Sequence, residues 1–183
     1  MSQCRGVERW IEKLRASLAS ASPVPSPRAS SLVSLPVFPA TSAGDPLCAM
    51  EEFEELIEVE ESVAGRASFA LRVKGDSMLD AGIKDGDLVL IHETTNWPGP
   101  GQIVVVRIDE MESGSVLKRF YRLPDHIRLQ PANKEYPFLI VLPAWRLKDD
   151  IEEYYTKRYP SRPLQFLVES SVQCVGWYIC KVP

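Results

Sequence analysis

The spacing of apolar residues in this chain changes near Ala67. Beyond that residue, short runs of Val, Ile, Leu and aromatic residues are separated by turns of Gly, Pro, Asn and Asp. Runs of this kind are typical of strands, and their spacing predicts a mainly β domain with mostly antiparallel pairing. The predicted strands are Phe69–Val73, Leu88–His92, Gln102–Ile108, Val116–Tyr121, Ile127–Gln130, Phe138–Leu142, Leu164–Val168 and Val172–Cys180.

Three polar segments lie between these predicted strands. Asn96–Gly101 combines Asn, Pro and Gly and predicts a tight turn, whereas Glu110–Gly114 is polar enough to form the tip of a hairpin. Ala144–Arg162 is rich in Lys, Asp, Glu and Tyr. We expect this last segment to form a helical insertion between the final strands.

The chain ahead of the β pattern has a different composition. Apolar residues recur at helical spacing between Val7 and Leu18, which predicts one amphipathic helix over residues 6–19. Ser20–Pro39 is rich in Pro, Ser and Ala, and this composition predicts a mobile linker. Thr41–Pro46 predicts an exposed bend of small and turn-forming residues. The acidic run Glu51–Glu61 is consistent with a solvated helix or an edge strand, and we assign it no chemistry.

Composition narrows the function classes. With 183 residues and a formal net charge of -4, the chain lacks the concentrated basic charge needed to wrap nucleic acid, so a protein partner or peptide substrate fits better. The four cysteines form no CxxC pair and the two histidines have no metal-ligand spacing, which predicts reduced thiols, no metal and no cofactor. We find neither a secretory signal nor a membrane-spanning run and expect a cytoplasmic protein.

Two short segments carry the candidate chemistry. The first is Gly75-Asp76-Ser77-Met78, and the second is Val116-Leu117-Lys118-Arg119. A serine hydroxyl needs a positioned base to act as a nucleophile, and a desolvated lysine can serve as that base. Free lysine titrates near 10.4, so Lys118 would need a pKa roughly three units lower, which burial among apolar neighbours can produce.

The ordered motifs resemble the family of self-cleaving serine peptidases that includes LexA, UmuD and the phage repressors. The resemblance covers about Val37 to Val182, including the Gly-x-Ser-Met segment, the Val-Leu-Lys-Arg segment and a closing Val-Gly-Trp strand. It implies the antiparallel β fold of the LexA/UmuD C-terminal domain, with a flexible N-terminal arm. The helical insertion expected at Ala144–Arg162, near the C-terminus, departs from both LexA and UmuD.

The same resemblance implies roles for individual residues. Ser77 would be the nucleophile and Lys118 the general base, with the backbone amides of Asp76 and Ser77 as donors to the oxyanion. Ala43-Gly44 would be the scissile bond. Self-cleavage would then separate an arm, residues 1–43, from a peptidase domain, residues 44–183.

The short segment ahead of Gly44 makes the organisation most similar to UmuD. A LexA-type repressor carries a helix-turn-helix module before its cleavage site, whereas only one amphipathic helix is predicted here. We therefore expect a homodimeric accessory subunit of an error-prone Y-family polymerase of the UmuC type. Its cleavage would be stimulated by a RecA filament in the DNA-damage (SOS) response, without sequence-specific DNA binding or membrane association.

Several alternatives remain at this point. The chain is also compatible with a LexA-like repressor or repressor fragment, and with a binding module that has no catalytic activity. Ser115-Val116-Leu117-Lys118 matches the SxxK pattern of penicillin-binding proteins, but that motif requires a helix start and partner motifs that are absent. Type I signal peptidases use a similar Ser-Met and Lys pair, but they are membrane-anchored. Asp85 and Asp87 fit turn and strand-start positions better than catalytic acids.

Overall fold

The computed structural model describes residues 31–39, 55–109 and 115–182. The predicted helix over 6–19, the predicted bend with Ala43-Gly44 and the predicted hairpin tip at Glu110–Gly114 lie outside these residues. Within the described part of the chain, no helix is long and apolar enough to cross a membrane.

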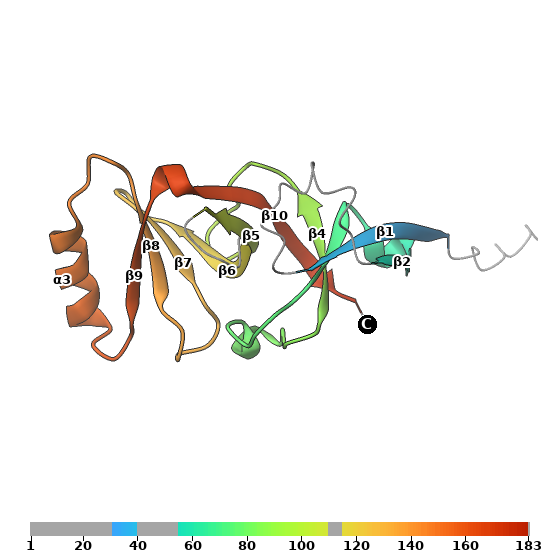
Figure 1. Ribbon diagram of the computed structural model, residues 1–183, viewed down its shortest axis with the longest axis horizontal. Helices are drawn as coiled ribbons and strands as arrows, with labels where there is room; N and C mark the ends of the chain where they lie inside the picture. Colours follow the sequence, from blue (N-terminus) through green and yellow to red (C-terminus); the bar gives the residue numbers. More distant parts are fainter. Residues whose placement is uncertain (1–30, 40–54, 110–114, 183) are drawn as a thin grey trace, which may run out of the picture. The chain divides into compact units, whose positions relative to one another are not determined.

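The described strands form one sheet (Figure 1). Its strand order is β2-β1-β3-β4-β10-β5-β6-β7-β8-β9. Two neighbouring pairs, β1 with β3 and β8 with β9, are parallel, and all other pairs are antiparallel. The strands are β1 (Leu32–Pro39), β2 (Glu55–Glu60), β3 (Phe69–Arg72), β4 (Leu88–Glu93), β5 (Ile103–Ile108), β6 (Ser115–Arg122), β7 (Ile127–Gln130), β8 (Phe138–Leu142), β9 (Leu164–Val168) and β10 (Val172–Lys181).

The strands expected after Ala67 are confirmed, with only small differences at their ends. Apolar runs bounded by turn residues located them correctly because both faces of this sheet pack against apolar side chains in most places. The expected turn at Asn96–Gly101 joins β4 to β5. The expected helical insertion is α3 (Lys148–Arg158), which connects the parallel strands β8 and β9.

The prediction of a linker up to Pro39 was wrong for its last eight residues, since Leu32–Pro39 is strand β1. Composition suggested that this segment could not fold alone. In the structure it is held by its pairing with β2 and β3. Leu35 and Val37 are buried against residues of three neighbouring strands, including Val59, Ala70 and Leu90. The apolar alternation outweighs the proline content because β1 lies between β2 and β3 in the sheet.

The described part of the acidic run forms an edge strand over Glu55–Glu60, one of the two structures expected for it. In β2 only Val59 is fully buried, and the glutamates of the strand are exposed. Charged side chains on an edge strand discourage pairing with other chains. A single turn of helix, α2 (Glu61–Ala64), follows directly.

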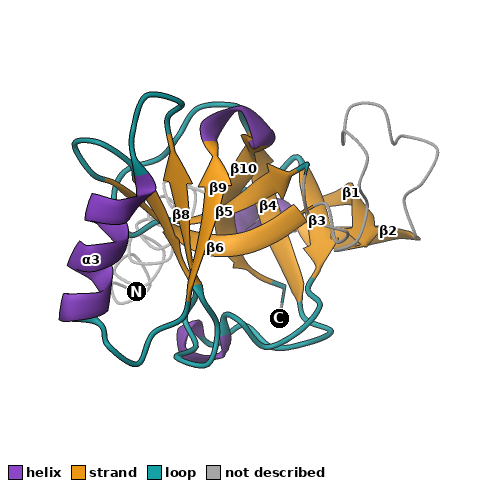
Figure 2. Ribbon diagram, turned by 60° about the vertical axis from the view of Figure 1, so that its left-hand side comes forward, coloured by secondary structure: helices purple, strands orange, loops and turns teal. Residues whose placement is uncertain are grey.

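Each face of the sheet carries separate apolar clusters. On one face, Met78 and Ile83 from the β3–β4 loop pack on side chains of β3, β4, β5 and β6. On the same face further along, Ile151 and Tyr155 of α3 pack on β8. Figure 2 shows α3 beside this end of the sheet. The opposite face of β5 to β10 holds another cluster that contains Val104, Phe120 and Leu139. Because side chains alternate along β6, Lys118 lies on this second face, with Val116 and Phe120.

Gly176 of the Val-Gly-Trp segment lies where β4 and β10 approach most closely. A Cβ atom at this position would be 2.5 Å from Ile91 Cγ2 and 2.7 Å from the carbonyl oxygen of His92. The strand register also shifts between Cys174 and Gly176. The glycine is therefore required by close backbone approach.

Candidate active site

Ser77 lies in the loop that connects β3 to β4, just before the short 3-10 helix η1 (Leu79–Ala81). The neighbouring Met78 is only 1% exposed and anchors the loop in the core. Gly75 has φ +83°, a left-handed conformation that favours glycine, and its amide donates to Asp85 Oδ1 at 2.6 Å. These contacts hold Ser77, which is half-buried, at the surface of the apolar cluster.

Lys118 lies in the middle of β6, opposite Val104 of β5. Its side chain is only 6% exposed, which is unusual for a lysine. The residues on either side along the same face, Val116 and Phe120, are apolar. The strand thus directs an amine into an apolar environment.

The structure brings these two side chains together. Lys118 Nζ donates to Ser77 Oγ at 2.8 Å and to the carbonyl oxygen of Leu117 at 3.0 Å. Among the described residues, Lys118 forms no ion pair. Burial lowers the pKa of Lys118 from 10.5 to about 8. About one tenth of this amine is therefore neutral near pH 7 and can accept a proton, far more than for an exposed lysine.

A cleft of about 320 Å³ opens beside this pair. Its walls are mainly apolar and come from β3, the β3–β4 loop, β6 and the start of β8. The lining residues include Leu71, Val73, Val116, Pro137 and Leu139. An apolar cleft of this size suits a short segment of peptide with small side chains.

The backbone amides of Asp76 and Ser77, the expected oxyanion donors, belong to this loop. Within the described part of the chain, neither amide donates a hydrogen bond. The carbonyl oxygen of Asp76 is engaged: it accepts from Leu79 N at 3.1 Å and from Asn133 Nδ2 at 3.1 Å. The two amides are thus available for a ligand, while the loop is held in place through the carbonyl oxygen of Asp76.

Sequence reasoning missed Asn133 and Tyr136, which lie in the turn between β7 and β8. The Tyr136 hydroxyl donates a hydrogen bond to Asp76 Oδ1, and this bond raises the pKa of the Tyr136 phenol. Tyr136 also lines the cleft. Nothing in the composition of this turn indicated that it would reach the loop that carries Ser77.

The structural roles expected for Asp85 and Asp87 agree with their contacts. Asp85 accepts from Gly75 N, and Asp87 Oδ2 accepts from Lys84 N at 2.7 Å. Asp87 also pairs with Lys181 at 3.1 Å. Its pKa is lowered, chiefly by the backbone hydrogen bond from Lys84. Both carboxylates stabilise turns of the β3–β4 loop.

The SxxK alternative does not fit the fold. Ser115 and Lys118 both lie in strand β6, and the motif requires a helix start. The described residues contain no group of three or more His, Cys, Asp or Glu side chains that could hold a metal ion.

Ala43-Gly44 lies outside the described residues, but the strands on either side of it are placed. Pro39, the last residue of β1, is paired with Arg72, the last residue of β3. On the other strand, Glu55 is paired with Val37, and its carboxylate contacts Arg72 at 2.6 Å. Pro39 and Glu55, the described residues that flank segment 40–54, therefore lie next to the end of β3 that leads to Ser77.

The family model described as "Peptidase S24-like" matches residues 36–151. The chain belongs to this family.

Among its relatives is a LexA repressor of Caldicellulosiruptor saccharolyticus, 41% identical over 111 residues, which cover 60% of this chain and 53% of that protein. LexA repressor 2 of Geobacter sulfurreducens is 46% identical over 109 residues, covering 60% of this chain and 52% of the relative. A LexA repressor of Myxococcus xanthus is 43% identical over 108 residues, covering 57% and 47%. This S24-family chain thus spans about half the length of the curated relatives it matches.

Proposed function

We propose that this S24-family chain is a self-cleaving serine peptidase that uses Ser77 as nucleophile and Lys118 as general base to cut Ala43-Gly44. The observation that carries the proposal is the 2.8 Å contact between Lys118 Nζ and Ser77 Oγ at a lysine that is 6% exposed. A buried lysine without an ion-pair partner is costly for a fold, and such groups are concentrated at functional sites.

The proposed reaction needs only these groups and water. Neutral Lys118 removes the hydroxyl proton of Ser77, and Oγ attacks the carbonyl carbon of Ala43. The amides of Asp76 and Ser77 stabilise the negative oxygen that develops. The lysine ammonium then gives its proton to the departing nitrogen of Gly44, leaving Ala43 as an ester on Ser77. Lys118 activates a water molecule that hydrolyses this ester.

Cleavage within one chain is favoured by the strand pairing. The chain leaves β1 at Pro39, and Ala43 follows four residues later, within about 14 Å of Pro39 for an extended chain. Ser77 follows Arg72, the partner of Pro39, by five residues, a reach of about 17 Å. The segment with the scissile bond and the loop with the serine thus start from neighbouring residues, which gives a high effective concentration.

The regulatory role that best fits the relatives is that of a LexA-like repressor cleaved in the DNA-damage (SOS) response. The named relatives are LexA repressors, and they support this function better than a UmuD-like polymerase accessory subunit. In both cases we propose a homodimer whose cleavage is stimulated by a RecA filament. The filament would need only to favour the conformer in which Ala43-Gly44 occupies the cleft.

The test is the intact mass of the chain after incubation with RecA, nucleotide and single-stranded DNA. We expect a product that begins at Gly44, and we expect Ser77→Ala and Lys118→Ala to fold but remain full length. The rate should rise about tenfold per pH unit below the Lys118 pKa and level off above it. An uncut wild-type chain, or a rate that does not depend on pH, would contradict the proposal and favour a binding module without catalytic activity.

DNA binding separates the two regulatory roles. A LexA-like repressor should retain damage-box DNA in a filter-binding assay before cleavage and release it afterwards. A UmuD-like subunit should show no such retention, and its cleaved form should associate with an error-prone polymerase of the UmuC type.

A further inference from the structure

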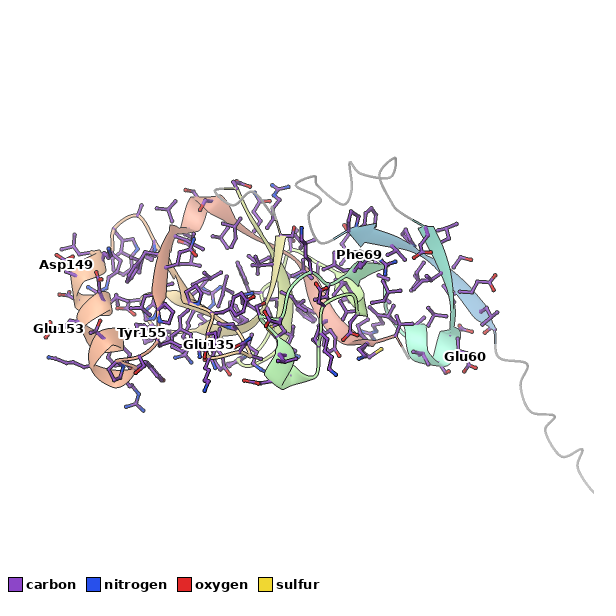
Figure 3. All side chains as sticks on the ribbon, turned by 60° about the horizontal axis from the view of Figure 1, so that its bottom comes forward. Glu60, Phe69, Glu135, Asp149, Glu153 and Tyr155 are labelled. Carbon is purple, nitrogen blue, oxygen red and sulfur yellow. The ribbon has the colours of Figure 1, made fainter. Side chains whose placement is uncertain are left out.

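Three hydrogen bonds join the β7–β8 turn to the loop that carries Ser77. Asn133 Nδ2 donates to the carbonyl oxygen of Asp76, the Tyr136 hydroxyl donates to the Asp76 carboxylate, and Asp80 N donates to the carbonyl oxygen of Ala132 at 2.7 Å. Two of these bonds end on Asp76, directly before Ser77. In Figure 3, Glu135 marks this turn beside the loop.

The turn is itself well ordered by internal hydrogen bonds. Asn133 Oδ1 accepts from Glu135 N at 3.0 Å, and the carbonyl oxygen of Asn133 accepts from Tyr136 N at 3.3 Å. Asn133 therefore uses its side-chain oxygen to shape the turn and its side-chain nitrogen to bind Asp76. The two side chains that reach Asp76 start from a fixed backbone.

The carbonyl oxygen of Asp76 and the amide hydrogen of Ser77 belong to one peptide unit. That unit is planar and trans, so the two groups point in opposite directions. A hydrogen bond that fixes the oxygen therefore also fixes the direction of the Ser77 N–H. Accepting hydrogen bonds at the oxygen also polarises the unit and strengthens its N–H as a donor.

The Asp76 side chain affects the oxyanion site through the negative charge of its carboxylate. A carboxylate near a developing oxyanion raises its energy by repulsion of like charges. The hydrogen bond from Tyr136 spreads this negative charge and holds the carboxylate in one position. Tyr136 also lines the cleft beside Ser77.

We propose that Asn133 and Tyr136 are positioning residues for the oxyanion-binding turn, with Asn133 orienting the Asp76–Ser77 peptide unit and Tyr136 restraining the Asp76 carboxylate. Neither side chain transfers a proton or touches the scissile bond in this proposal. It rests on the proposed self-cleavage, and it assigns the β7–β8 turn a part in transition-state stabilisation.

The test measures the first-order rate constant of self-cleavage across pH. The variants are Asn133→Asp, which keeps the acceptor for Glu135 N but removes the donor, and Tyr136→Phe. We expect each plateau rate to fall roughly tenfold to 100-fold, somewhat less than the loss of a whole oxyanion donor. For Tyr136→Phe the pH midpoint should stay at its wild-type value, because this variant changes no charge near Lys118. Tyr154→Phe, at an exposed position on α3, is the matched control and should cleave at the wild-type rate.

A double-mutant cycle separates the hydrogen bond from Asn133 to the Asp76 carbonyl oxygen from the hydrogen bond from Tyr136 to the Asp76 carboxylate. In an Asp76→Ala background the carboxylate is absent, so Tyr136→Phe should have no further effect. Asn133→Asp should still slow cleavage there, because the backbone carbonyl remains. A purely structural role for the turn would make both variants act equally in the two backgrounds.

Each result decides the matter. Three results would overturn the positioning roles while leaving the proposed function intact: rates within about twofold of wild type, a pH midpoint shifted in Tyr136→Phe, or an effect of Tyr136→Phe that is as large in the Asp76→Ala background as in wild type. If the wild-type chain fails to cleave and Ser77 resists a fluorophosphonate probe, the proposed function itself fails, which is a different outcome.

Discussion

Two buried polar sites in this protein are built in opposite ways. At the cleft, Lys118 forms hydrogen bonds to the Ser77 hydroxyl and to one carbonyl oxygen. It has no carboxylate partner among the described residues. Under α3, His126 is just as buried, at 7% exposure, but both ring nitrogens have partners: Asp125 at 2.7 Å and the Tyr155 hydroxyl at 2.9 Å. Figure 3 shows Tyr155 pointing from α3 toward the sheet.

The second site continues outward through an ion pair. Asp125 also contacts Arg146 at 2.9 Å, just before α3 begins, and its pKa is lowered because the His126 and Arg146 interactions outweigh the opposing effect of burial. This chain of polar groups attaches the insertion to the β6–β7 connection. A completed network stabilises a fold, whereas a buried amine without a counter-charge costs stability and gains reactivity.

The largest effect should come from replacing the unpaired amine. Lys118→Met keeps the length and apolar stem of the side chain but removes the base, so we expect self-cleavage to slow by about 10⁴-fold or more. Below pH 8 the variant should also be more stable than wild type, because no charge has to be buried. Intact mass and thermal unfolding measure the two effects, and a less stable variant would contradict the comparison.

The pH dependence of stability sharpens the same point. Burial lowers the pKa of Lys118 from 10.5 to about 8, which corresponds to roughly 3 kcal/mol at about 1.36 kcal/mol per pH unit. Between these values the unfolded chain binds more protons than the folded chain, so the free energy of unfolding should rise with pH in this window. The unfolding free energies of wild type and Lys118→Met should differ by a constant amount below about pH 8, and this gap should close between about pH 8 and pH 10.5.

A substitution at His126, whose partners are Asp125 and Tyr155, should lower stability and leave cleavage nearly unchanged, which is the reverse of the result expected for Lys118→Met. His126→Ala leaves the Tyr155 hydroxyl and one oxygen of Asp125 without their partner, so we expect a loss of about 2 kcal/mol in unfolding free energy. At temperatures well below the transition, the rate of self-cleavage should remain within about twofold of wild type. A large loss of cleavage in a stably folded variant would show that the two sites are coupled.

The smallest effect is expected for an exposed lysine. Lys157 on α3 pairs with Glu153 at 2.6 Å, but its side chain is 75% exposed. Lys157→Met should change the unfolding free energy by less than about 0.5 kcal/mol and leave cleavage unchanged. It is the matched control for Lys118→Met, and a comparable effect at both positions would mean that burial is not the deciding property.

Much of the fold could be predicted from local patterns. The apolar runs from Phe69 onward located eight strands, and the charged segment ahead of Leu164 located α3, because turns and periodicity are encoded over a few residues. Strand β1 was missed because its stability comes from pairing with β2 and β3, which are distant in sequence. The parallel pairing of β8 with β9 and the pairing of β10 with β4 and β5 also depend on distant segments.

The sequence by itself determined the residue types of the candidate dyad, since Ser77 and Lys118 stand out by their motifs and apolar neighbours. Only the tertiary structure decided that they meet, at 2.8 Å across 41 residues, and that Asn133 and Tyr136 converge on Asp76. The physical reason is that burial and hydrogen-bond geometry arise from strand pairing between distant segments. A local pattern can specify a strand or a turn, but it does not specify what the neighbouring strand brings beside it.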